Sequence, residues 1–209
     1  MNHMELWDKV KVTDPAAVKK ITGKPYQGNS PKPYWLIERA TEVFGPIGKG
    51  WGVTVKSERF ERLSDTDVLH VAVVSVWYTV DGERTQTFDQ MGGTKACYMT
   101  GKGALMVDED AGKKSVTDGM VKCLSMIGFA GDIFSGMWDD SKYVEWAGDQ
   151  YRPQPDVAAI LKGIANSSSI DLLKTNFTHA MQMLDTVHHE ALISAKDKRK
   201  SELTEKAKA

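Results

Sequence analysis

The spacing of apolar residues predicts a helix near residue 33, followed by an antiparallel β-meander. From Pro33 to Gly45, apolar residues recur at helical intervals and form one face: Leu36, Ile37, Ala40, Val43 and Phe44. Residues 51–62 alternate in their second half, and residues 67–80 are apolar on both faces, as in a strand at the centre of a sheet. Asp81-Gly82 is a strong hairpin signal, so residues 84–93 are expected to form the return strand.

The second half of the chain has a helical pattern. Two shorter elements are expected ahead of it: a short helix at residues 15–21, near the N-terminus, and a loop or short helix at residues 94–110, after the meander. Residues 113–136, "KKSVTDGMVKCLSMIGFAGDIFSG", place Val116, Met120, Cys123, Leu124 and Ile127 on one helical face, with a glycine in mid-helix. Residues 156–164 predict a short helix, and Asn-Ser-Ser-Ser at 166–169 predicts the cap of a long amphipathic helix. We therefore expect an α+β fold, with one domain over residues 1–195 and a charged flexible tail over residues 196–209.

The composition of the chain is that of a globular protein. Its 209 residues are 41% hydrophobic and 26% charged, with a formal net charge of −1. No apolar run approaches the ~20 residues of a membrane span, and the first ten residues lack an apolar signal region. Two cysteines, Cys97 and Cys123, are too few for a disulfide framework, so we expect reduced thiols in a cytosolic protein with no membrane association.

The sequence contains no recognisable motif for covalent catalysis. Gly-Lys occurs in "GGTKACYMTGKGA", but Lys102 is followed by Gly103, which does not fit a nucleotide-binding P-loop. The acidic run Asp108-Glu109-Asp110 has two interpretations: a divalent-metal site of a nuclease, or the N-terminal cap of the helix that follows. We expect capping and no cofactor, and keep a metal-dependent nuclease as the alternative function.

Basic residues gather on the segments around the central helix and in the preceding loop. These are Lys95, Lys102, Lys113, Lys114 and Lys122, together with Lys24 and Lys32. Such lysines either form a solvated surface or bind phosphates, and nearby glycines let a polyanion approach the main chain. Their positions alone leave both interpretations open.

Four segments, taken in order, resemble the single-strand annealing proteins of the Rad-fifty-two superfamily, phage type. They are "ITGK" (21–24), "ERATEVFGPIGKGWG" (38–52), "VDGERTQTFDQMGGTK" (80–95) and "KKSVTDGMVKCLSMIGFAGDIF" (113–134). The last is similar to the signature helix of that family, with Val-Thr-Asp-Gly followed by a basic position and a glycine-containing end.

The resemblance implies a helix–β-β-β–helix core that assembles into a homo-oligomeric ring. A protein of this kind binds single-stranded DNA in a basic groove and anneals complementary strands in recombination, without ATP, metal or covalent catalysis. The resemblance further implies the bacterial host cytoplasm as the location, and a phage exonuclease or a host single-strand-binding protein as candidate protein partners. Thr117 and Asp118 would hold neighbouring backbone, and Gly119 would permit close approach of another segment.

The resemblance also implies DNA-binding residues. Lys24 falls at the deep-groove basic position, Lys102 at an outer-site lysine, and Lys113 at the start of the signature helix. Of the basic pair after Thr-Asp-Gly only Lys122 is kept, since Val121 replaces its partner, and Thr66 stands where the family has a basic residue. Further candidates for the groove are Lys56, Arg59 and Lys114. Lys24 and Lys122 are the strongest candidates.

Overall fold

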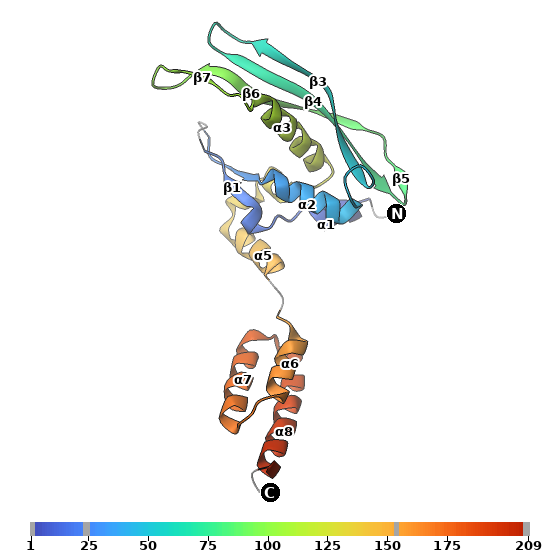
Figure 1. Cartoon of the computed structure of the whole chain (residues 1–209), viewed down its shortest axis with the longest axis vertical. Coiled ribbons are helices and arrows are strands. Elements are labelled where there is room, and N and C mark those ends of the chain that lie inside the picture. The colour runs from blue at the N-terminus through green and yellow to red at the C-terminus, as the bar shows by residue number, and fades with distance from the viewer. Residues whose placement is uncertain (1–2, 23–25, 153–154, 207–209) are drawn as a thin grey trace. The chain divides into compact units, whose positions relative to one another are not determined.

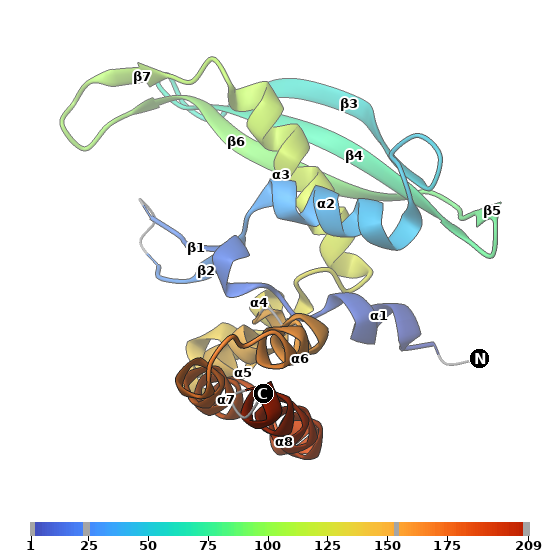
Figure 2. The same cartoon turned by 60° about the horizontal axis from the view of Figure 1, so that its bottom comes forward.

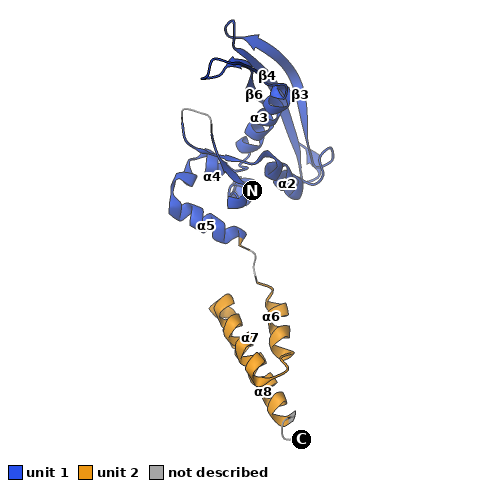
Figure 3. Ribbon diagram, turned by 60° about the vertical axis from the view of Figure 1, so that its left-hand side comes forward, with its two compact units in different colours: residues 1–151 blue, residues 152–209 orange. Residues whose placement is uncertain are grey.

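The computed structural model describes residues 3–22, 26–152 and 155–206, and divides the chain into two compact units, residues 1–151 and 152–209 (Figure 3). This division differs from the expected single domain over residues 1–195. The two prolines at residues 153 and 155 are the sequence signal that could have indicated this boundary. No helix in the described ranges is both long enough and apolar enough to span a membrane.

The first unit contains an antiparallel sheet with strand order β3-β4-β6-β7. Its strands are β3 (Trp51–Arg62), β4 (Val68–Val80), β6 (Phe88–Met99) and β7 (Leu105–Val107), with the short β5 (Glu83–Arg84) paired to β4. The first two match the expected strands, and β4 lies between β3 and β6 as its two apolar faces predict. The expected turn occurs at Asp81-Gly82, between the paired ends of β4 and β5. The coarse prediction of an α+β fold with an antiparallel meander is therefore confirmed.

Helices α2 (Pro33–Phe44) and α3 (Ala111–Met126) lie on the same side of this sheet (Figures 1 and 2). The first agrees with the expected helix and ends at Gly45 as predicted. The second agrees at its start but ends at Met126, where the helical pattern was expected to run on towards residue 136. Ala72 and Val74 of β4 pack with Met120 and Leu124 of α3 in the core of the unit. Alternate residues of β4 point to the other face of the sheet, which no described element of this unit covers in either view. We call this the open face.

Shorter elements complete the first unit. They are α1 (Glu5–Val10), the 3₁₀ turn η1 (Pro15–Ala17), β1 (Val18–Lys20), β2 (Asn29–Pro31), α4 (Gly131–Phe134), the 3₁₀ turn η2 (Met137–Asp139) and α5 (Ser141–Tyr151). The expected helix at 15–21 is wrong beyond Ala17, because Val18–Lys20 pairs with Asn29–Pro31 as a hairpin.

A buried carboxylate, Asp132, joins several of these pieces. It accepts hydrogen bonds from the Thr13 amide and hydroxyl, the Trp138 indole and the Tyr143 phenol.

One local expectation within the sheet needs correction. Residues 94–110 were expected to be loop or short helix, but β6 continues to Met99 and turns back into β7. The reason is strand pairing on both sides of β6: Leu69 of β4 pairs with Lys95, and Cys97 pairs with Val107 in a local hairpin. The Gly-Lys-Gly at residues 101–103, in the turn of that hairpin, is the sequence signal that could have indicated it.

The second unit is a bundle of three helices, α6 (Val157–Ala165), α7 (Ile170–Met183) and α8 (His189–Lys206), with a 3₁₀ turn η3 (Thr186–His188). The expected cap of α7 is present, since Ser169 accepts a hydrogen bond from the Leu172 amide. Asp156, which was expected to begin α6, is instead its N-cap and accepts from the Ala159 amide. The expected continuous helix is interrupted after Met183, where Leu184 is extended and the chain turns back. This turn places Leu184 and Leu192 in one core with Leu173.

Helix α8 also continues to Lys206, where the sequence predicted a flexible tail from residue 196. Leu203 packs against the core of the second unit. Arg199 donates to the Ser167 carbonyl at 2.9 Å and to Glu202 at 2.7 Å. One apolar contact and one anchoring arginine therefore hold a segment whose composition alone is typical of a solvated tail.

Candidate nucleic-acid interface

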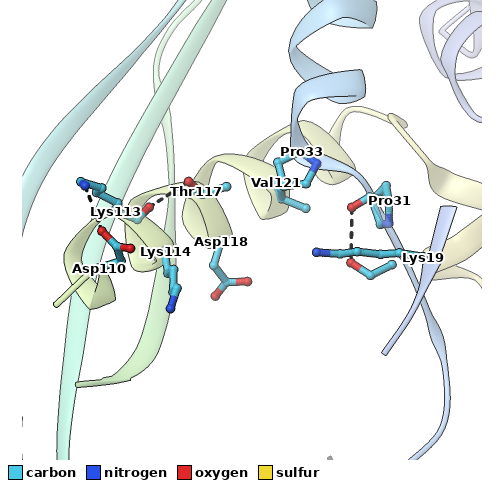
Figure 4. A pocket seen from close by; sticks show the side chains of 10 residues that line it. Lys19, Pro31, Pro33, Asp110, Lys113, Lys114, Thr117, Asp118 and Val121 are labelled. Atoms are coloured by element: carbon cyan, nitrogen blue, oxygen red, sulfur yellow. Dashed lines mark hydrogen bonds and ion pairs between the residues drawn. The ribbon is translucent and has the colours of Figure 1, made fainter. Parts of the chain in front are cut away.

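A groove opens between the β1–β2 hairpin, the start of α2 and helix α3 (Figure 4). Its volume is about 520 Å³, and we call it the lysine groove. It is lined by Lys19, Ser30, Pro31, Pro33, Asp110, Lys113, Lys114, Thr117, Asp118 and Val121. Three of these residues are lysines and two are aspartates, so the groove carries a small positive excess at neutral pH.

Two of its lysines lie on the first turn of α3, as the sequence predicted, and each is paired with an aspartate. Lys113 lies 2.9 Å from Asp110, and Lys114 lies 2.6 Å from Asp108. The hydrogen bond to Asp110 raises the pKa of Lys113 above its ordinary value, and the bond to Asp108 does the same for the pKa of Lys114. Both lysines therefore remain charged at neutral pH. Their pairs are solvent-exposed, and such pairs contribute little to stability.

Lys19 enters the groove from β1, on the side opposite the start of α3 (Figure 4). Among the described residues its amine has no hydrogen-bonded or ionic partner. Sequence reasoning did not single it out, because its placement depends on the β1–β2 pairing. The Lys19-Lys20 doublet before a Pro/Gly-rich loop is the sequence signal that could have indicated it.

Lys122, one of the two strongest candidates, does not line the groove. Its amine donates to the Met91 carbonyl at 3.2 Å and pairs with Asp118 at 2.8 Å. Asp118 in turn accepts the Gly93 amide at 3.1 Å. The side chains of Lys122 and Asp118 thus form hydrogen bonds with backbone groups on the edge of β6 that faces away from β4. These bonds give Lys122 a structural role. At the neighbouring position, which does line the groove, this chain has Val121.

The expectation that Asp118 and Thr117 hold backbone agrees with this geometry. Asp118 binds the β6 amide, and the Thr117 hydroxyl donates to the Lys113 carbonyl one turn earlier. The expected close approach at Gly119 is also present, against Val74 and Gly92 of the sheet.

The remaining candidate residues lie elsewhere or outside the described residues. Lys24 falls in residues 23–25, which are not among those described. Lys102 lies in the turn between β6 and β7 and does not line the groove. Lys56 and Arg59 lie on β3 and do not line it either; they pair with Asp89 at 3.3 Å and with Glu61. Arg59 is opposite Val71 in the β3–β4 register, which places it on the open face.

The acidic run before α3 does not have the geometry of a metal site. Asp108 accepts the Asp110 amide and the Lys114 amine, and Asp110 accepts the Lys113 amine. Asp110 occupies the N-cap position of α3, but its side chain accepts no hydrogen bond from a backbone amide of the helix. Of the expected capping, only the bond from the Asp110 amide to the Asp108 carboxylate is present. In the described ranges, no three acidic, histidine or cysteine side chains gather as metal ligands.

Comparison with known proteins finds no match for this chain, either among models of protein families or among curated proteins.

Proposed function

We propose that this chain binds single-stranded DNA in the lysine groove and anneals complementary strands without ATP. The observation that carries the proposal is the convergence of lysines from two separate segments, Lys19 on β1 and Lys113 and Lys114 on α3, on one open groove. The order of sequence motifs similar to single-strand annealing proteins supports the same function.

The chemistry of the groove suits a phosphate backbone better than base edges. Ammonium groups on flexible stems bind phosphates as point charges, and three lysines outnumber two carboxylates in the lining. The Lys113–Asp110 and Lys114–Asp108 pairs are exposed, so a phosphate can replace the carboxylate at small cost. Release of counterions from the strand then supplies much of the binding free energy.

The proposal includes assembly into a homo-oligomeric ring. Met91 of β6, opposite Val73, is 53% exposed on the open face, and charged side chains of the strands pair with one another, as with Lys95 and Asp67 at 3.0 Å. A neutral, partly apolar sheet face is the kind of surface that a second subunit covers. Recombination in a bacterial host cytoplasm, together with a phage exonuclease or a host single-strand-binding protein, remains the proposed setting.

Annealing of two complementary oligonucleotides in EDTA and without ATP tests this function. We expect the protein to accelerate duplex formation, because charge neutralisation requires neither metal nor nucleotide. A non-complementary pair is the control for aggregation. Loss of annealing in EDTA, or cleavage of the oligonucleotides when magnesium is restored, would contradict the proposal and favour the nuclease that uses Asp108, Glu109 and Asp110.

A further inference from the structure

A second pocket lies next to the lysine groove and differs from it in chemistry. It has a volume of about 420 Å³ and lies between η1 and the first two turns of α2. Its apolar lining comes from Ala16, Ala17, Tyr34, Trp35 and Ile37. We call it the Tyr34 pocket. Tyr34 is the most exposed of its aromatic side chains, with 84% of its surface accessible.

The two aromatic residues of this pocket differ in how they are held. Trp35 makes an edge contact with the ring of Tyr151, with ring centroids 6.4 Å apart, so its orientation is fixed by packing within the unit. Tyr34 has no ring contact with any described aromatic residue. A large aromatic ring is therefore presented to solvent beside an anchored one, which is the arrangement of a stacking platform.

The polar groups of the Tyr34 pocket do not suit a phosphate. Its one lysine, Lys32, donates its amine to the Ala16 carbonyl at 2.8 Å. Its two carboxylates belong to Asp14, which accepts the Ala16 amide, and to Glu38, whose carboxylate has no partner among the described residues. Carboxylates repel phosphate but accept hydrogen bonds from ring and amino N–H groups. The pocket therefore suits a flat, uncharged group that carries N–H donors.

The lysine groove and the Tyr34 pocket have neighbouring lining residues at the start of α2. Pro33 lines the groove (Figure 4), whereas Lys32 and Tyr34, next to it in sequence, line the Tyr34 pocket. Consecutive Cα atoms are about 3.8 Å apart, so the two linings meet at this point of the chain.

We propose that the Tyr34 pocket takes one nucleobase of the bound single strand, stacked on the Tyr34 ring, while the adjoining phosphates lie on the lysines of the groove. This inference rests on the proposed DNA binding and adds a site that holds a base as well as the backbone. Bases that carry an amino group, such as cytosine and adenine, would be favoured over thymine because of the acceptors on Asp14 and Glu38.

A fluorescent base analogue and a variant at Tyr34 test the proposal. An oligonucleotide in which 2-aminopurine is placed at successive positions is added to the full-length protein. We expect quenching on binding to the parent, and its loss in Tyr34→Ala with affinity weakened roughly 5- to 100-fold. Tyr34→Phe keeps the ring and should bind like the parent. Phe134→Ala removes another exposed ring, on α4, and is the control expected to change neither signal.

An abasic oligonucleotide separates stacking from a structural effect. If Tyr34 acts through a base, Tyr34→Ala and the parent should bind an abasic strand equally. If the parent binds single-stranded DNA but Tyr34→Ala shows the same affinity and quenching, the Tyr34 pocket is not a base site and the proposed function stands. If the parent binds no single-stranded DNA even at low salt, both proposals fail.

Discussion

Gly92 of β6 and Gly119 of α3 lie so close that a Cβ atom on Gly92 would be 2.5 Å from the Gly119 nitrogen. A Cβ on Gly119 would in turn lie 2.7 Å from Cγ2 of Val74. The two glycines therefore let the helix backbone rest directly on the sheet. This contact fixes the position of α3, and with it the place of Lys113 and Lys114 in the lysine groove.

Gly92→Ala should lower the free energy of unfolding by about 3 kcal/mol or more, at or above the top of the usual range for overpacked sites, since the added methyl group meets helix backbone. Urea unfolding of the full-length protein measures the change. Gly112→Ala is the matched control within α3, because its Cβ would meet only the His70 ring, at 3.8 Å or more. Equal stability of Gly92→Ala and the parent would mean that α3 does not pack this closely.

The long regular elements around this contact were predictable from the sequence. The bounds of β3 match the expected strand, and α2 and α3 begin within two residues of the expected helices. Each of these elements is long enough to show the apolar periodicity of a strand or of a helix in its own sequence. The end of β6 and the hairpin of β1 and β2 were missed, because β1, β2 and β7 have only 3 residues each and show no periodicity of their own. The turn at Leu184 depends on packing between α7 and α8.

The candidate site was predictable only in part. Lys113 and Lys114 were found from their place at the start of a helix, and the structure puts them in the groove. Lys19 was missed because it enters through strand pairing. Arg59 lies on the open face because strand register, which the sequence did not reveal, decides its direction.

Asp118→Ala should destabilise the protein by about 1 kcal/mol, because the variant loses an acceptor for the Gly93 amide and leaves Lys122 without its carboxylate. Lys122→Ala should have a smaller effect, since its bonds to Met91 and Asp118 are exposed. Thermal unfolding of the two variants measures both effects. A stability loss in Lys122→Ala greater than that in Asp118→Ala would contradict this assignment of roles.

Stability should fall at high pH partly because of Tyr143. Burial, with Asp132 nearby, raises the pKa of this phenol above the ordinary value of 10.0. The folded state therefore keeps the proton at pH values where the unfolded state releases it, so unfolding becomes easier above about pH 10. Tyr143→Phe should be less stable at neutral pH, because it loses the hydrogen bond to Asp132, yet decline less steeply between about pH 9 and about pH 11. An equally steep decline in the variant would argue against the role of Tyr143.

Ending the chain after Lys196 should unfold the second unit and spare the first. The truncation removes Leu203 from the core and the Arg199 bond to Ser167, and a bundle this small has little stability to spare. Ending it after Tyr151 should leave the first unit folded, because its core residues all precede that point. Limited proteolysis with mass spectrometry checks both variants. Protection of residues 152–196 in the first variant would mean that the end of α8 is dispensable.

Binding of single-stranded DNA as a function of salt tests the central proposal most directly. The parent is compared with a variant carrying Lys19→Gln, Lys113→Gln and Lys114→Gln, and with Lys49→Gln, an exposed lysine outside the groove, as control. The plot of log affinity against log salt concentration should flatten by roughly 0.7 for each phosphate that the variant no longer neutralises, and by a similar amount for any base sequence. The control should keep the slope of the parent. If the triple variant also keeps that slope and affinity, the lysine groove is not where the strand binds.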